Sequence, residues 1–228
     1  MLHSSKQVLG LPILASGVEV GSLHDLLTDR HSWRIQLLAI DLGDMYVEAP
    51  AELAEAPWLH SLSLKISPHE LKGFPPYHAR ALDVPHDTGR LPRWLFPVRG
   101  PAAAPHAHLG RPAPGEPDAF LEGYISLRHL PGVHVRASDG DSGHVESALL
   151  DDADRMVRFL VIDPINWWPG PHVLVPVEWV QAIESELTLR ATKAQIRKLP
   201  EYDPSRLPLD DEAAAELYER YADEHPFA

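Results

Sequence analysis

Histidine is the residue type in this chain with the widest chemical repertoire, because imidazole can bind a metal or transfer a proton near neutral pH. The 228-residue sequence has 14 histidines, and His106 and His108 form its one close pair. Glu116 and Asp118 follow, but a segment rich in proline and alanine does not pre-organise the geometry that a metal requires. We therefore expect solvated histidines and no cofactor, with His106 and His108 as the candidate ligands if a metal is bound.

Aspartates and serines offer a second route to chemistry. Five aspartates gather in the second half of the chain, at Asp139, Asp141, Asp151, Asp152 and Asp154. They lack the loop pattern of a calcium hand, so capped turns and a solvated acidic face are the expected roles. Ser142 and His144 alternate along an expected strand without a third group to orient them, and the sequence has no nucleophile elbow or glycine-rich phosphate loop. The sequence therefore predicts a protein that is not an enzyme.

Trp167 and Trp168 are adjacent, and adjacent side chains on a strand point to opposite sides. One of them could then fill the core while the other faces outward as an interface anchor. The alternative is that both close one end of the core, because buried aromatic area also seals a small core. The candidate partner-binding residues are Trp167, Trp168, Asn166, Arg158, His144, Asp151 and Asp152.

These residues must be positioned by a duplicated unit, because residues 10–41 align with residues 132–163 at a constant offset and without a gap. Identical residues recur at Gly10/Gly132, Ala15/Ala137, Ser16/Ser138, Gly21/Gly143, Leu27/Leu149, Asp29/Asp151, Leu38/Leu160, Ile40/Ile162 and Asp41/Asp163. The match resumes at residues 61–65 and 186–190, after a slightly longer insertion in the second copy. The chain is therefore a tandem repeat.

Local patterns predict the secondary structure of each copy. Ser67 with Glu70, and Thr192 with Gln195, form capping boxes that each predict a short helix. Apolar and polar residues alternate over residues 133–138, and turn residues at 139–141 indicate a hairpin. Residues 157–162 form the most apolar strand. After Asp210, a helix is expected to about residue 222, with one apolar face that packs on the core or binds a partner; this face contains Ala214, Leu217, Tyr218 and Tyr221.

The predicted fold class is mainly β, with two small antiparallel β-barrels in tandem, short capping helices and a C-terminal helix. We expect a first, diverged barrel over residues 1–84, a linker rich in proline, alanine and histidine over residues 85–118, and a second barrel with the helical tail over residues 119–228. Within the linker, residues 93–98 form an apolar run that is expected to dock as an edge strand.

Composition narrows the function further. The net charge of −13 and the pI of about 5.4 disfavour nucleic-acid binding, because phosphate backbones would be repelled. Cysteine is absent, which removes disulfides and thiolate chemistry. We expect no signal peptide and no transmembrane segment, and hence a cytoplasmic location.

The second copy resembles the PRC-barrel family, which takes its name from the cytoplasmic domain of the photosynthetic reaction centre H subunit. The resemblance rests on the run from Gly143 to Asp152, on Arg158-Phe159-Leu160-Val161-Ile162-Asp163, on Asn166-Trp167-Trp168-Pro169-Gly170 and on Val173-Leu174-Val175-Pro176. In the first copy, Gly17-Val18 replaces the Asp-Gly turn, and no Trp-Trp-Pro-Gly run is present. The resemblance implies a compact β-barrel that recruits partners or stabilises assemblies and has no common catalytic motif.

The function expected from these observations is a non-enzymatic binding or assembly module for an unidentified protein partner. Membrane association, if any, would be peripheral and would come through that partner, and self-association is an open possibility. Fusing two copies in one chain could reproduce a contact that single-copy relatives make by dimerising. The alternative is a metal- or small-ligand-binding sensor, or an enzyme, with a site between the two barrels.

Overall fold

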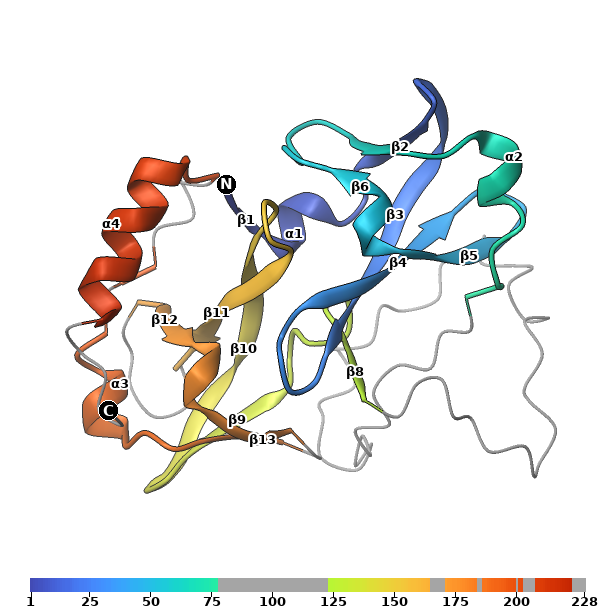
Figure 1. The fold of residues 1–228 in the computed structure, drawn as a ribbon. Helices are drawn as coiled ribbons and strands as arrows, with labels where there is room; N and C mark the ends of the chain where they lie inside the picture. The colour runs from blue at the N-terminus through green and yellow to red at the C-terminus, as the bar shows by residue number, and fades with distance from the viewer. Residues whose placement is uncertain (78–122, 165–170, 184–185, 200, 203–207, 223–228) are drawn as a thin grey trace, which may run out of the picture.

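The computed structural model describes residues 1–77, 123–164, 171–183, 186–199, 201–202 and 208–222. This part of the chain is mainly β and forms two seven-stranded sheets, one for each repeat (Figure 1). The sheet of the first repeat contains β2 (Pro12–Ala15), β3 (Val18–Asp29), β4 (Ile35–Asp41), β5 (Tyr46–Pro50), β6 (Ala54–Glu55), β7 (Leu62–Leu64) and β8 (Tyr124–Ser126). The sheet of the second repeat contains β9 (His134–Ala137), β10 (Gly140–Asp151), β11 (Met156–Asp163), β12 (Val173–Pro176), β13 (Val180–Ile183), β14 (Leu187–Leu189) and β1 (Leu2–Ser4).

Helices in the described residues are short, except at the C-terminal end. They are α1 (Ser5–Val8), η1 (Ala51–Leu53), α2 (Pro68–Leu71), η4 (Val177–Trp179), α3 (Lys193–Ile196) and α4 (Asp211–Ala222). The predicted capping boxes are confirmed at α2 and α3, where Ser67 and Thr192 each accept a hydrogen bond from the backbone of the residue three positions on. No helix in this part of the chain combines the length and the apolar character needed to cross a bilayer.

The duplication is confirmed in three dimensions. The first sheet has the strand order β5-β4-β3-β2-β7-β6 and the second has β12-β11-β10-β9-β14-β13, so equivalent strands occupy equivalent places. Gly21 and Gly143 show why a glycine recurs at this position: a Cβ atom would lie 1.9 Å from the carbonyl oxygen of Asp41 in one repeat and 1.9 Å from that of Asp163 in the other. In both repeats, the backbone of β3 or β10 passes directly against the end of the neighbouring strand.

The sheets differ from the predicted antiparallel barrels in the direction of some strands and in closure. β2 pairs with β7 in parallel, and β9 pairs with β14 in parallel, because the β6–β7 and β13–β14 hairpins return to the first strand of their repeat in its own direction. Both sheets are therefore mixed, and no closed barrel is found in the described residues. The structure confirms the mainly β class but not the tandem barrels.

The two repeats exchange their leading strands. β1 precedes the first repeat but pairs with β10 of the second, with Ser4 opposite Leu149. β8 precedes the second repeat but pairs with β3 of the first, with Ser126 opposite Leu27. The two pairings are equivalent residue by residue, so the exchange is reciprocal. The predicted division into residues 1–84 and 119–228 follows chain order, whereas hydrogen bonding crosses it in both directions.

A pseudo-twofold axis passes between Arg34 and Met156, which are equivalent in the two repeats and form an antiparallel bridge with each other. The N–H of Ile35 donates to the carbonyl of Arg155 at 2.7 Å, and the N–H of Val157 donates to the carbonyl of Trp33 at 2.9 Å. Trp33 and Arg155 are equivalent and share a left-handed backbone, with φ of 58° and 60°. The repeats therefore meet as the two halves of a symmetric dimer would meet.

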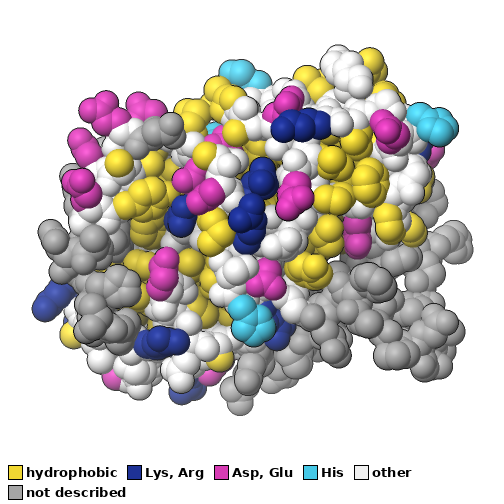
Figure 2. All heavy atoms as spheres, viewed as in Figure 1, with side chains coloured by type: hydrophobic (Ala, Val, Ile, Leu, Met, Phe, Trp, Pro, Cys, Tyr) yellow, Lys and Arg dark blue, Asp and Glu magenta, His cyan; other side chains and the backbone are white. Residues whose placement is uncertain are grey.

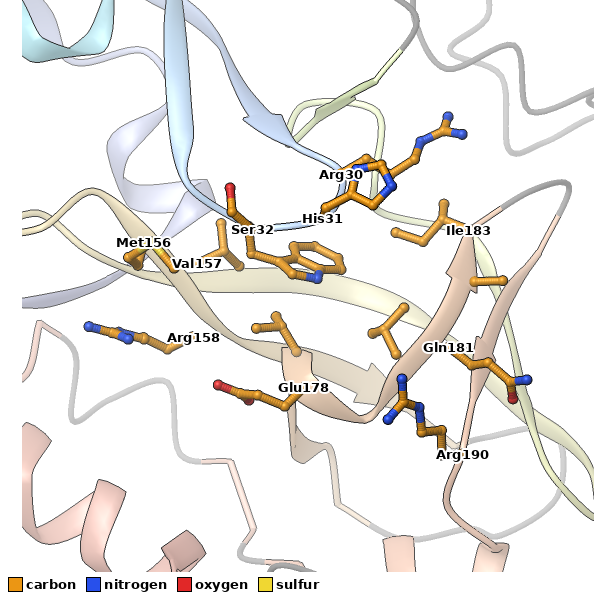
Figure 3. Close-up of a pocket in the computed structure, with 14 residues that line it drawn as sticks. Arg30, His31, Ser32, Met156, Val157, Arg158, Glu178, Gln181, Ile183 and Arg190 are labelled. Carbon is orange, nitrogen blue, oxygen red and sulfur yellow. The ribbon is translucent and has the colours of Figure 1, made fainter. Parts of the chain in front are cut away.

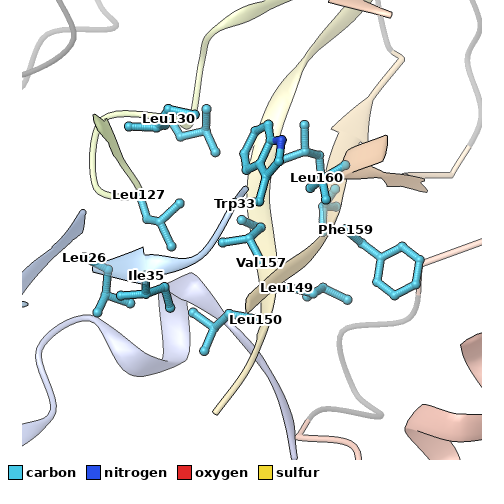
Figure 4. Close-up of a cluster of buried hydrophobic side chains, with 14 of the residues drawn as sticks. Leu26, Trp33, Ile35, Leu127, Leu130, Leu149, Leu150, Val157, Phe159 and Leu160 are labelled. Carbon is cyan, nitrogen blue, oxygen red and sulfur yellow. The ribbon is translucent and has the colours of Figure 1, made fainter. Parts of the chain in front are cut away.

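A large hydrophobic cluster runs through both repeats, beside a smaller one formed by Leu27, Ala39 and Tyr77. Its buried residues come from both sheets and include Leu26, Ile35 and Leu127 beside Leu150 and Val157 (Figure 4). Because this cluster is continuous, the described parts of the two repeats share buried contacts.

The C-terminal helix α4 packs on the second repeat. Of the two predicted roles for its apolar face, packing on the core and binding a partner, the structure shows the first. Ala214 is buried, and the ring of Tyr218 stacks on Phe159 at 5.8 Å between centroids. Just before the helix, Leu209 exchanges two backbone hydrogen bonds with Leu2 at 2.9 Å each. The predicted edge strand at residues 93–98 lies outside the described residues.

Candidate functional site

A pocket of about 520 Å³ lies between the two repeats (Figure 3). The hairpin between β3 and β4 forms one wall, and η4 with strands β11, β13 and β14 forms the other. We call this place the open junction. It is lined by Arg30, His31, Ser32, Trp33, Met156, Val157, Arg158, Val177, Glu178, Val180, Gln181, Ala182, Ile183 and Arg190.

The hairpin at the open junction is shaped by Asp29. Its carboxylate accepts hydrogen bonds from the N–H of Ser32 at 2.7 Å, from the Ser32 hydroxyl at 2.7 Å and from the N–H of His31 at 3.1 Å. The backbone bond from Ser32, with the other two, lowers the pKa of Asp29. This turn leaves Arg30 and His31 exposed while Trp33 is buried. The loop therefore presents a cation at the pocket rim and an aromatic ring in its floor.

Three arginines line the open junction, each from a different element. Arg158 is paired with Asp154 and lies 5.6 Å from the centre of the Tyr218 ring, so its position is fixed. Arg30 and Arg190 are exposed, and neither has an ion-pair partner among the described residues. Among the described residues that line the pocket, Glu178 is the one acidic residue (Figure 3). The lining therefore carries more positive than negative charge.

The pseudo-equivalent place on the other side of the axis, which we call the closed junction, is filled. Here Asp152 occupies the position of Arg30, and its carboxylate accepts hydrogen bonds from the N–H of Trp58 at 2.8 Å and from the His3 ring at 3.0 Å. It also accepts one from the Met1 ammonium at 2.7 Å. Trp58, His3 and Asp152 are all buried. Symmetry-related parts of the fold thus form a packed contact on one side and a pocket on the other.

Burial would raise the pKa of Asp152, but the hydrogen bonds from His3, Met1 and Trp58 outweigh it and hold the pKa well below its usual range. The carboxylate is therefore charged at neutral pH and bound on several sides by this chain. Its function is to fix β1 and Trp58 to the hairpin that follows β10.

A second buried carboxylate belongs to Asp25, in the first repeat. It accepts hydrogen bonds from the Ser126 hydroxyl, from the Tyr77 hydroxyl at 3.0 Å and from the N–H of Arg128 at 2.9 Å. Burial, with the nearby Asp25 charge, raises the pKa of Tyr77. Ser126 also contacts His129 at 2.9 Å, but its hydroxyl is buried and already donates to Asp25. The cluster therefore anchors the exchanged strand β8 and does not present a nucleophile.

The predicted partner-binding residues fall at different places. Arg158 lines the open junction, whereas Asp151 accepts a hydrogen bond from Tyr218 at 3.4 Å and Asp152 is buried at the closed junction. His144 lies on β10, 4.0 Å from Asp163, and His172 approaches the same carboxylate at 3.8 Å. Asn166, Trp167 and Trp168, and the metal candidates His106 and His108, lie outside the described residues. Among the residues that are described, no three His, Asp or Glu side chains gather as a metal site.

Sequence reasoning missed Arg30, Trp33 and Arg190. The available signal was the set of positions where the repeats differ: Arg30 aligns with Asp152, Trp33 with Arg155, and Arg190 with Lys65. The first two pairs differ in charge, and a change of charge at equivalent positions indicates that the two copies differ in role there; Arg190 and Lys65 have the same charge and give no such signal. Searches against protein-family models and against curated proteins found no match for this chain.

Proposed function

We propose that this chain is a non-enzymatic binding module of the PRC-barrel type, in which the two repeats form an internal pseudo-dimer and the open junction receives the partner. The observation that carries this proposal is the asymmetry of the two junctions. Two copies related by exact symmetry would have two equal junctions, whereas this chain fills one with Trp58 and leaves the other open over a pocket. A binding role for one junction explains the difference.

A second surface extends the proposal to the predicted tryptophan turn. Residues 165–170 lie in sequence between β11, which ends at Asp163, and β12, which begins at Val173. His144 and His172 both approach the Asp163 carboxylate. These histidines are partly exposed, with 32% and 42% of the side chain accessible. Trp167 and Trp168 follow within a few residues of this group, and we retain them as candidate partner anchors.

The test is cross-linked co-purification of the full chain from the soluble and membrane fractions of its source. Arg30→Gln/Arg190→Gln tests the open junction and Trp167→Ala/Trp168→Ala tests the turn. Lys65→Gln is the matched control, because Lys65 is the equivalent of Arg190 at the closed junction. A partner that is recovered with the wild type and the control, but lost with the arginine variant, supports the proposal. Equal recovery with all variants would remove the open junction as the partner site.

The second candidate function is a small-ligand sensor, and one observation favours it. The pocket lies between the repeats, where that alternative placed its site, and a volume of about 520 Å³ is within the range of small-molecule sites. The absence of any partner in the co-purification would favour this candidate over the assembly role.

A further inference from the structure

The charges at the open junction oppose those of the protein as a whole. The chain has a net charge of −13, yet the described residues that line this pocket include three arginines, Arg30, Arg158 and Arg190, and one acid, Glu178. Like charges held close together repel, so such a group is expected only where it is compensated. Asp154 compensates Arg158, but no described carboxylate pairs with Arg30 or Arg190.

The closed junction has less positive charge at the equivalent positions. Asp152 replaces Arg30 and Gln36 replaces Arg158, Lys65 keeps the charge of Arg190, and Arg155 stands in place of Trp33, while a glutamate is present in both repeats, as Glu52 and Glu178. Lys65 in turn lies 3.9 Å from Glu55. The excess of positive charge is therefore a property of the open junction alone, and it is not a consequence of the repeated fold.

Apolar side chains form part of the inner surface of the pocket. Val157 is fully buried, and Trp33, Val177 and Ile183 each keep only 5–6% of their surface accessible. A ring and branched aliphatic side chains below a cationic rim suit a ligand with an apolar body and a charged end. Figure 3 shows Arg30 above the pocket and Arg190 below it, on opposite sides of this surface.

We propose that the open junction binds a small organic anion, with its carboxylate or phosphate group held by Arg190, whose guanidinium points toward the pocket in Figure 3, and its apolar body placed over Trp33; Arg30, on the opposite side, adds positive charge at the rim. The planar guanidinium group of Arg190 can donate two hydrogen bonds to such an oxyanion. The protein as a whole is strongly negative and repels anions. An anion would therefore be attracted to this local positive site and not to the surface in general. This inference rests on the open junction being the binding site of the proposed function.

The test is isothermal titration of the full chain with three probes of one size: phenyl phosphate, phenylacetate and phenethylamine. We expect saturable binding of one molecule of at least one anion and none of the amine. Whichever anion binds more tightly identifies the preferred head group. Arg30→Gln/Arg190→Gln should weaken anion binding at least about tenfold, since it removes the charge-assisted hydrogen bonds of Arg190 and the positive charge of Arg30. Lys65→Gln should leave it unchanged.

A second variant tests whether the planar guanidinium of Arg190 is needed. Arg190→Lys retains the charge but not the planar group, and it should bind the anion with an affinity between those of the wild type and the double variant. Failure of both anions to bind, or equal binding of the amine, would overturn the inference. If the anions fail while the arginine variant still loses its co-purified partner, the anion inference fails and the proposed function stands. If neither depends on the arginines, both fail.

Discussion

The closed and open junctions are built from equivalent elements but use them differently. At the closed junction, Trp58 and Asp152 are buried, and the carboxylate is bound by His3 and by the Trp58 backbone. At the open junction the hairpin carries Arg30 in place of Asp152, and the space beside it remains a pocket. Figure 2 shows one face of the molecule, on which a few basic side chains lie near the middle among several acidic ones. Under the proposed function, one copy of this contact stabilises the fold and the other is available for binding.

Mutations at the closed junction and at the open junction should have different consequences. Changes at the closed junction should reduce stability, because they remove buried contacts. Changes at the open junction should reduce binding and leave stability nearly constant, because Arg30 and Arg190 are exposed. The predictions below test this division, from the largest expected effect to the smallest.

Trp58→Ala should give the largest effect. The side chain is 1% exposed and lies in the common core, so its removal should lower the free energy of unfolding by about 4 kcal/mol. Denaturant titration measures this change. Trp58→Phe is the control: the indole Nε1 has no hydrogen-bond partner in the described residues, so phenylalanine should retain most of the stability. A loss below about 1 kcal/mol for Trp58→Ala would contradict a packed closed junction.

Asp152→Asn should lower stability by about 3 kcal/mol at pH 7, because it leaves the His3 and Met1 contacts without a charged acceptor. Asp151→Asn is the neighbouring control and should cost less, since this carboxylate is more accessible and its contacts with Met1 and Tyr218 are long, at 3.5 and 3.4 Å. Equal losses for the two variants would contradict a special role for Asp152.

The same carboxylate predicts a pH dependence. The folded-state pKa of Asp152 lies below the usual value for an aspartate, because burial is outweighed by the hydrogen bonds to the carboxylate, so the folded state favours the charged form. Its contribution is fully present above the unfolded pKa and is lost as the pH falls toward the folded pKa. The stability difference between the wild type and Asp152→Asn should therefore be constant from pH 7 to about 5 and should shrink below about pH 4. Denaturant titrations across this range measure it.

Local features of the fold were predictable from the sequence. The capping boxes at Ser67 and Thr192, the hairpin between β9 and β10, and the end of the chain as a helix all depend on residues close together in the chain. The duplication predicted that both sheets would share one strand order. These predictions are confirmed because short-range hydrogen bonding and periodicity carry the information.

The strand exchange and the pocket were not predictable in this way. β1 contains only Leu2, His3 and Ser4, which is too short for any periodic signal, and its partner β10 lies far along the chain. The pocket combines Arg30 of one repeat with Arg158 and Arg190 of the other, so it exists only after the two repeats have packed. Of the predicted site residues that the structure describes, Arg158 is the one found at this pocket, and its binding role stays a prediction.

Asp154→Asn should have the smallest effect on stability, and it tests directly whether charge beside the open junction affects anion binding. The Asp154 ion pair with Arg158 is partly exposed, with 43% and 30% of the two side chains accessible, so its loss should cost less than about 1 kcal/mol. Asparagine retains the side-chain oxygen that accepts from the N–H of Met156 at 3.1 Å. The substitution therefore removes a negative charge beside the pocket with little change in structure.

Removal of this charge should raise the affinity for phenyl phosphate by about threefold, because a unit charge several ångströms away contributes roughly 0.6 kcal/mol in water. Glu146→Gln is the matched control, since it removes a partly exposed carboxylate that pairs with Lys6 and is not part of the pocket lining. Titration at low ionic strength compares the two variants, and added salt should reduce the gain. Equal gains in both variants would mean that the anion responds to the net charge of the protein, and that Arg158 does not belong to a binding site.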